Sequence, residues 1–252
     1  MTKPRLRIPG TIAQDLGLKI VSGRFKPGAV LEGEVAASGQ RKVSRSAYRE
    51  AVRILVAKGL VESKPKLGTR VSVMSRWHLL DPDVISWIFT GQPNKDQLSA
   101  LFEMRNIVEP EVVALAAKRR TREQLADMKA ALDGMARHKL RTPKGRQADR
   151  QFHAALLAAS GNPFLMSLNS SIDAAVAWST VFKYRVRTQH RDSLPDHVKV
   201  YEAVAARNVT AARRAMHELV NLAFLDTLDA GSQARGKAAA KKPAARKAAR
   251  RK

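Results

Sequence analysis

The spacing of hydrophobic residues changes from helical to strand-like within residues 11–73. Ile12, Leu16 and Ile20 recur four positions apart, which predicts a helix over residues 11–22. Further along the chain, other apolar stripes and turn residues mark the remaining elements. The predicted elements are helices over 11–22, 32–38 and 44–58, and a hairpin with strands over 60–63 and 70–73 around a turn at 66–68. This order is that of a winged helix-turn-helix domain, which we place at residues 8–75.

After Val73 the chain has no alternating pattern, and apolar positions recur at helical spacing as far as residue 230. Residues 95–230 are therefore predicted to form an all-helical bundle of six or seven helices. A linker over residues 76–94 carries apolar side chains suited to docking on a neighbouring domain: Trp77, Leu79, Leu80, Ile85 and Trp87. The fold class is mainly α, with a small wing.

The net charge of +24 is the strongest compositional signal. Residues 231–252 are rich in Lys, Arg and Ala and lack the apolar side chains needed for a core, so we expect a disordered tail. A basic body with a basic tail favours a polyanionic partner, nucleic acid before membrane.

Several classes of protein are excluded by what the sequence lacks. It has no cysteine, hence no disulfide, and this fits a reducing cytoplasm. No stretch reaches the roughly 18 consecutive apolar residues of a membrane span. The basic N-terminus has no apolar signal core, so we expect no membrane association and a cytoplasmic location, on the nucleoid.

Three arginines share one face of the helix predicted at 44–58. Arg45, Arg49 and Arg53 lie four residues apart, opposite the apolar stripe. A recognition helix must pack on one side and present long donors on the other, and arginine is well suited to bidentate contact with guanine. The alternative is a solvated charged face, and the order of elements shifts the balance towards DNA. The predicted DNA-binding set is Ser44, Arg45, Ser46, Arg49, Arg53, Lys64, Lys66, Gly68, Thr69 and Arg70.

The stretch "IVSGRFKPGAVL…VSRSAYREAVRILVAKGLVESKPKLGTRV" resembles the DNA-binding domain of the GntR family of bacterial transcription regulators. The resemblance implies that Arg45 and Arg49 contact operator bases or phosphates and that Gly68 lies at the wing tip. One departure is in the second helix, where family members usually carry larger apolar groups. Those places hold Ala37, Ser38, Arg41 and Lys42. We expect a loosely packed second helix.

The segments "EMRNIVEPEVVALAAKRR", "DRQFHAALLAASGN" and "DHVKVYEAVAARNVTAARRAM" resemble the FCD ligand-binding domain of the FadR subfamily, and "WHLLDPDVISW" resembles its sugar-acid-responsive branch. This resemblance implies a divalent metal, zinc or similar, on Asp149, His153 and His197. The chain departs from the pattern at the third histidine position, which is Leu219, and His217 is displaced from it. The alternative is a polar pocket that binds its effector without metal.

Two further residues are candidates for effector binding. The resemblance places Arg105 where the family directs an arginine into the pocket, and a guanidinium matches a carboxylate. Its alternative role is an ion pair with Glu103 or Glu109. Asn162 is a candidate donor, although it follows Gly161 and can equally serve helix-end chemistry.

Together these features predict a homodimeric transcription regulator that binds an inverted-repeat operator in double-stranded DNA. We expect a repressor released by a small carboxylate such as a sugar acid. A nonspecific nucleoid-associated protein is the alternative, favoured by the tail. A metal-dependent enzyme is disfavoured, because no nucleophile or general base lies at a supporting spacing.

Overall fold

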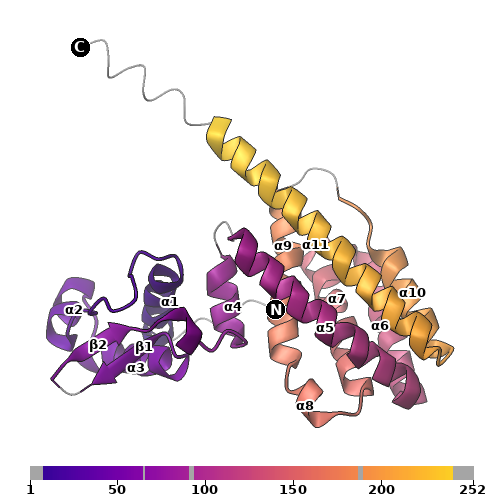
Figure 1. The fold of residues 1–252 in the computed structure, drawn as a ribbon, viewed down its shortest axis with the longest axis horizontal. Coiled ribbons are helices and arrows are strands. Elements are labelled where there is room, and N and C mark those ends of the chain that lie inside the picture. The colour runs from indigo at the N-terminus through magenta and orange to yellow at the C-terminus, as the bar shows by residue number, and fades with distance from the viewer. Residues whose placement is uncertain (1–7, 65, 91–93, 187–189, 241–252) are drawn as a thin grey trace. The chain divides into compact units, whose positions relative to one another are not determined.

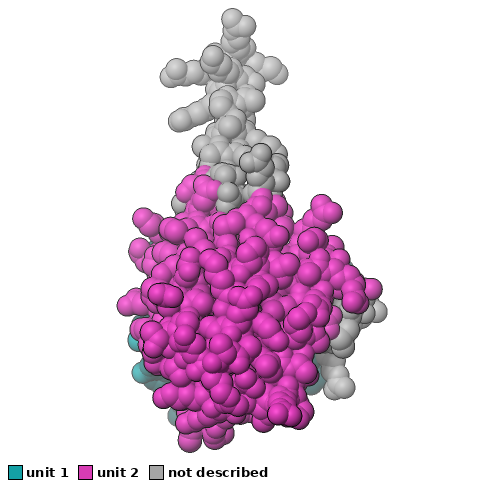
Figure 2. Space-filling model, turned by 90° about the vertical axis from the view of Figure 1, so that its right-hand side faces the viewer, with its two compact units in different colours: residues 1–91 teal, residues 92–252 magenta. Residues whose placement is uncertain are grey.

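The computed structural model describes residues 8–64, 66–90, 94–186 and 190–240, and it divides into two compact units, Met1–Gly91 and Gln92–Lys252 (Figures 1 and 2). The fold is mainly helical, with one small sheet in the first unit. No helix among the described residues is long and apolar enough to cross a membrane. Each unit is described separately.

The first unit has the predicted winged helix-turn-helix order. Its elements are α1 (Ile8–Val21), α2 (Glu34–Arg41), α3 (Arg45–Ala57), β1 (Val61–Lys64), β2 (Gly68–Val71), a 3-10 turn (Met74–Arg76) and α4 (Pro82–Phe89). Leu16, Ile20 and Leu55 are fully buried between α1 and α3, as their spacing predicted.

Local chemistry explains where α3 begins and ends. The Ser44 hydroxyl accepts a hydrogen bond from the Ala47 amide at 3.1 Å, which satisfies a first-turn donor. Gly59 follows the helix with φ of +71°, and a Cβ there would lie 2.1 Å from the carbonyl oxygen of Arg76. Only glycine permits both this conformation and this close approach.

The hairpin pairs β1 with β2 in antiparallel register, with Val61 opposite Val71 and Lys64 opposite Gly68. The segment before α2 adds one bridge to it, between Val30 and Arg70. In α2, Ala37 is the one described side chain that is buried. The second helix therefore contributes little apolar area, in line with its unusual composition.

Residues 76–94, predicted to be a linker, include α4, which packs on α1. Trp77 and Trp87 join the core of the first unit, and the Trp87 ring lies so close to Gly17 that an added Cβ would be 2.3 Å from it. Lys58 pairs with Asp81 at 2.8 Å and with Asp83 at 2.9 Å. The docking surface for these tryptophans is therefore the winged domain itself.

The second unit consists of helices alone among its described residues, seven of them, as the sequence predicted. They are α5 (Lys95–Arg119), α6 (Arg122–His138), α7 (Pro143–Ala159), α8 (Pro163–Met166), α9 (Asn169–Val186), α10 (Leu194–Ala205) and α11 (Val209–Ala240). The long helices α5 and α11 lie side by side (Figure 1), and Phe102, Phe152 and Met216 are among the fully buried core residues. Thr121 and Gln124 form a capping box at the start of α6.

The structure differs from the sequence prediction at the start of the tail. Residues 231–240 continue α11 as helix, whereas a disordered tail was expected from residue 231. Alanine and lysine are strong helix formers, so an existing helix propagates into this composition. Residues 241–252 lie outside the described part of the chain.

Candidate functional site

The predicted DNA-binding face of α3 is exposed. Arg45, Arg49 and Arg53 are all exposed, on the side of the helix opposite Tyr48 and Leu55. Ser44 and Ser46 at the N-terminus of α3 are also exposed, with their hydroxyl oxygens 3.1 Å apart. The N-terminal end of α3 therefore carries both hydroxyls and guanidinium groups, as expected of the end that a recognition helix directs into a groove.

The sequence did not identify the carboxylate that meets this face. Glu34 of α2 receives two hydrogen bonds from Arg49, from Nε at 3.1 Å and from Nη2 at 2.9 Å. The hydrogen bond from Arg49 lowers the pKa of Glu34, so its carboxylate is ionised at neutral pH. Both side chains are solvent-accessible, so the pair holds the Arg49 fork in one direction at little energetic cost.

The predicted DNA-binding residues of the hairpin differ in their exposure to solvent. Lys64, Lys66 and Gly68 are exposed at or beside the wing tip, where Lys66 and Gly68 both have positive φ. Arg70 is partly buried and donates from Nη1 to the Gly28 carbonyl oxygen at 3.1 Å. This bond connects the hairpin to the turn before it, and the predicted DNA contact of Arg70 stays a prediction.

A groove of about 740 Å3 brings the two predicted regions together. Arg49 and Arg53 line it from α3, and Gly68 and Thr69 line it from β2. The Thr69 hydroxyl donates to the Ser63 hydroxyl at 3.2 Å across the hairpin. Helix and wing thus share one surface of the first unit.

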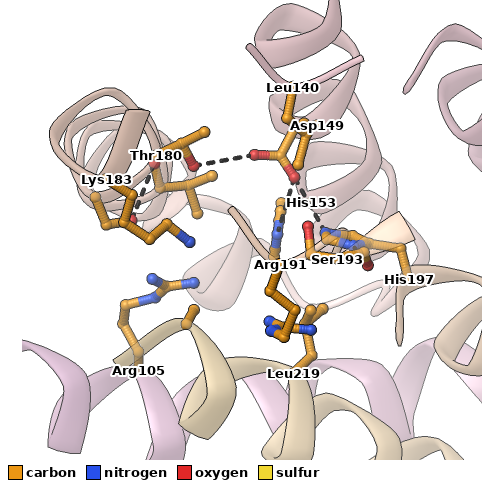
Figure 3. Close-up of a pocket in the computed structure, with 13 residues that line it drawn as sticks. Arg105, Leu140, Asp149, His153, Thr180, Lys183, Arg191, Ser193, His197 and Leu219 are labelled. Carbon is orange, nitrogen blue, oxygen red and sulfur yellow. Dashed lines mark hydrogen bonds and ion pairs between the residues drawn. The ribbon is translucent and has the colours of Figure 1, made fainter. Parts of the chain in front are cut away.

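The second unit encloses a small cavity of about 30 Å3 (Figure 3). Asp149 and His153 reach it from α7 and His197 from α10, and one ligand atom of each lies within 4.8 Å of the others. All three are buried. The metal candidates predicted by the family resemblance therefore converge.

Hydrogen bonds fix which imidazole nitrogens face one another. His153 Nδ1 lies 3.1 Å from Glu109 Oε2, and His197 Nδ1 lies 2.7 Å from the carbonyl oxygen of Ser193. Each Nδ1 has an acceptor, so each carries a proton, and in the neutral imidazole Nε2 then has a bare lone pair.

Both Nε2 atoms face Asp149 Oδ1, at 4.0 Å from His153 and 3.1 Å from His197. Three electron-pair donors then face one another. This arrangement is stable when a cation lies between them or when the imidazoles carry an added proton. Burial alone would raise the pKa of Asp149, but when the imidazoles carry an added proton, the hydrogen bond from His197 and the positive charge of both rings lower it. This donor set fits a divalent metal. Glu109, Ser193 and Thr180 each form a hydrogen bond or ion pair with one of the three candidate ligands and so orient them.

Arg105 lies at the cavity and forms the ion pair that the sequence gave as its alternative role. It lines the cavity from α5 and also forms a buried ion pair with Glu109, with Nε 2.5 Å from Oε1. Burial would raise the pKa of Glu109, but Arg105 and His153 together lower it to about 2. Glu109 therefore links the guanidinium to the metal candidate His153.

Leu219 lines the cavity from α11, where the family pattern has a histidine, and it offers no ligand atom. His217 is exposed and contacts Asn221 at 3.0 Å, outside the cavity. Asn162 also lies elsewhere: its Oδ1 accepts from the amides of Phe164 and Leu165 and caps α8. These bonds are the helix-end chemistry that the sequence offered as the alternative role of Asn162.

Several lining residues were missed from the sequence, among them three that carry polar or charged groups and lie on α9 or before α10. Lys183 of α9, and Arg191 and Ser193 before α10, meet the cavity from segments with no motif of their own. The run of basic residues around Lys183 was the one available signal, and it does not show which side chain points inwards.

Comparison with known proteins agrees with both units. Residues 10–71 match bacterial regulatory proteins of the gntR family, and residues 100–222 match the FCD domain. The Galactonate operon transcriptional repressor of Escherichia coli (strain K12) is 32% identical over 203 residues, covering 79% of this chain and 88% of that protein. HTH-type transcriptional regulator LutR of Bacillus subtilis (strain 168) is 31% identical over 202 residues, covering 78% of this chain and 90% of that one.

A solved structure has a similar fold. It is described with the words "Lar controls the expression of the Listeria monocytogenes agr system", and it covers 90% of this chain and 99% of its own, with a TM-score of 0.61 at 18% identity. At this identity the likeness shows the fold alone. With the winged domain and the matched relatives, the chain belongs to the GntR family of metabolite-responsive DNA-binding transcription regulators, as a FadR-type member with an FCD domain, and is not an enzyme.

Proposed function

We propose that this regulator is a repressor that binds its operator as a homodimer and leaves it when a small carboxylate, such as a sugar acid, occupies the cavity of the second unit. One observation carries the proposal: Asp149, His153 and His197 converge in a buried cavity that Arg105 also lines. A metal and a guanidinium are both suited to carboxylate oxygens. The two together favour an organic acid.

The DNA side of the proposal rests on α3 and the wing. Arg45 and Arg49 would contact bases or phosphates from the exposed face of α3, with Arg53, Ser44 and Ser46 beside them. The exposed wing residues Lys64 and Lys66 would contact the phosphate backbone. A two-fold dimer places two such helices about one turn of DNA apart, so the operator would be an inverted repeat.

On the effector side, Asp149, His153 and His197 would hold a divalent metal, zinc or a similar ion. Such an ion supplies a Lewis acid that binds carboxylate and hydroxyl oxygens. Three protein ligands leave at least one coordination position for a ligand, and Leu219 does not compete for it. Arg105 would orient the same carboxylate from α5.

One relative supports this class of effector by its name, the galactonate operon repressor. Besides the galactonate operon repressor, the Glc operon transcriptional activator of Escherichia coli (strain K12) is 26% identical over 231 residues, covering 87% of this chain and 89% of that protein. Both names refer to operons and say nothing of this chain's own target genes. The effector must bind one arrangement of the protein more tightly than the other, because only differential affinity shifts the equilibrium. Operator DNA would place the protein on the nucleoid, in the cytoplasm.

The test is fluorescence anisotropy of the full chain on its own upstream DNA and on a scrambled duplex, at near-physiological salt. The proposal predicts a preference of about a hundredfold or more for the upstream DNA, and release by a sugar acid in the presence of zinc. Arg213→Ala is a matched control for Arg49→Ala, because both arginines are exposed and ion-paired to a glutamate. Equal binding to every duplex across a genomic panel would instead favour the nonspecific nucleoid protein, for which the net charge of +24 argues.

A further inference from the structure

The cavity contains one cation for which the described residues provide no ion-paired partner. Arg105 is paired with Glu109, and Arg191 is paired with both Asp196 and Asp226. Lys183 is partly buried and directed into the cavity from α9 (Figure 3), and no described carboxylate lies within ion-pair distance of its Nζ. Burial lowers the pKa of Lys183, and the more distant Asp226 and Asp149 offset this only in part.

A second donor beside it is also unsatisfied. Nη2 of Arg191 is buried and has no hydrogen-bond partner, although Nε and Nη1 of the same guanidinium both have carboxylate partners. A buried donor without a partner costs free energy, which a ligand acceptor would recover. Lysine and arginine are donors only, so the missing group must be an acceptor.

Lys183 and Arg191 also lie between this cavity and a neighbouring one. They line both the cavity of about 30 Å3 and a neighbouring one of about 20 Å3. Arg191 and Leu140 line a third, surface-exposed cavity of about 320 Å3 as well. The buried cavity holds about one water molecule, so a larger ligand needs the neighbouring space. Displacing these side chains would join the three cavities and bring a long ligand past Lys183.

From these observations we propose that Lys183 and Nη2 of Arg191 form a second anion-binding subsite, so that the effector is an organic acid with two anionic groups. This inference rests on the proposed function, because the first group of the acid is the one held by the metal and Arg105. The second group is a carboxylate or a phosphate, since both fit a donor-only subsite.

The test uses sugar acids of one carbon skeleton in pairs, with the zinc-loaded full chain and isothermal titration calorimetry. Gluconate and galactonate carry one anionic group, glucarate and galactarate carry a second carboxylate, and 6-phosphogluconate carries a phosphate. We expect at least tenfold tighter binding of one of the dianionic acids than of its monoanionic partner. The acid that gains most identifies the second group.

Lys183→Met keeps the length of the side chain and removes its charge. We expect it to bind the monoacid within about threefold of the unsubstituted chain and to lose most of the preference for the diacid. Arg185→Met is the control, because Arg185 is exposed on the same helix. A melting temperature for each variant checks folding.

Three results would count against the idea, and they differ from one another. Equal binding of monoacids and diacids to the unsubstituted chain would overturn the second subsite and leave the proposed function intact. A preference that survives Lys183→Met would remove Lys183 from it. If none of the acids bound, the proposed carboxylate response itself would fail.

Discussion

Replacing Glu109 by glutamine should destabilise the second unit far more than the same change two residues along α5. Glu109 and Arg105 are both at least 95% buried, since their side chains are 5% and 4% exposed. Glutamine cannot neutralise Arg105, and breaking a buried pair by removing one charge costs about 3–5 kcal/mol. Glu111 pairs with Arg213 at 2.6 Å, but those side chains are 58% and 44% exposed. Glu111→Gln should therefore cost less than about 1 kcal/mol.

The pKa of Glu109 gives a second route to the magnitude. A pKa lowered from 4.5 to about 2 by Arg105 and His153 corresponds to about 3 kcal/mol of stability. Because the pKa is lower in the folded state, this contribution is complete above pH 4.5 and is lost as the pH falls towards 2. The two routes agree within their precision.

The assay is urea denaturation followed by far-UV circular dichroism, with EDTA present so that no metal contributes. We expect Glu109→Gln to lower the free energy of unfolding by about 3 kcal/mol at pH 7. The difference between Glu109→Gln and the unsubstituted chain should shrink as the pH is lowered below 4.5. Equal effects of Glu109→Gln and Glu111→Gln, or a difference that does not change with pH, would refute the buried ion pair.

Three further predictions concern the metal, the DNA-binding face and the first unit. His153→Ala should weaken zinc binding at least a hundredfold in competition with a chromophoric chelator, whereas His217→Ala, at an exposed histidine on α11, should leave it unchanged; equal effects would place the metal elsewhere. Arg49→Ala should weaken operator binding by about 1–3 kcal/mol in anisotropy, roughly 5- to 150-fold, and an effect no larger than that of Arg213→Ala would contradict a DNA contact. Gly17→Ala should lower the free energy of unfolding of the first unit by about 1–3 kcal/mol, because the added methyl group meets the Trp87 ring. Gly39→Ala in α2, where an added Cβ meets nothing within 4 Å, should raise this free energy slightly. Unfolding of both variants is followed by tryptophan fluorescence. A loss of stability in both variants would refute the packing argument.

Local patterns predicted most of the first unit. Four-residue spacing placed Leu16, Ile20 and Leu55 in the core, and Ser44 and Gly59 marked the ends of α3. Such signals act within one or two helical turns, so they can be read along the chain. The packing of Trp87 on Gly17 joins residues 70 positions apart, and no local pattern encodes it.

The cavity shows the same limit. Asp149 and His153 lie one turn apart on α7, and a family pattern links them to His197. Lys183 and Arg191 belong to segments whose contacts depend on how α9 packs on α7 and α11. Charge alone cannot tell a buried lysine from the exposed Arg185 two residues away. Asn162 is the opposite case, because its capping bonds are local and match the helix-end role that the sequence offered as one alternative.

The most direct test of the account is whether the cavity controls the DNA-binding unit. The measurement is anisotropy of labelled upstream DNA with the zinc-loaded protein, titrated with the sugar acid that binds most tightly, for the unsubstituted chain and for Asp149→Asn. The account predicts release of the unsubstituted protein, while Asp149→Asn binds the same DNA but stays bound at every concentration of acid. Release of both proteins at the same concentration would contradict it.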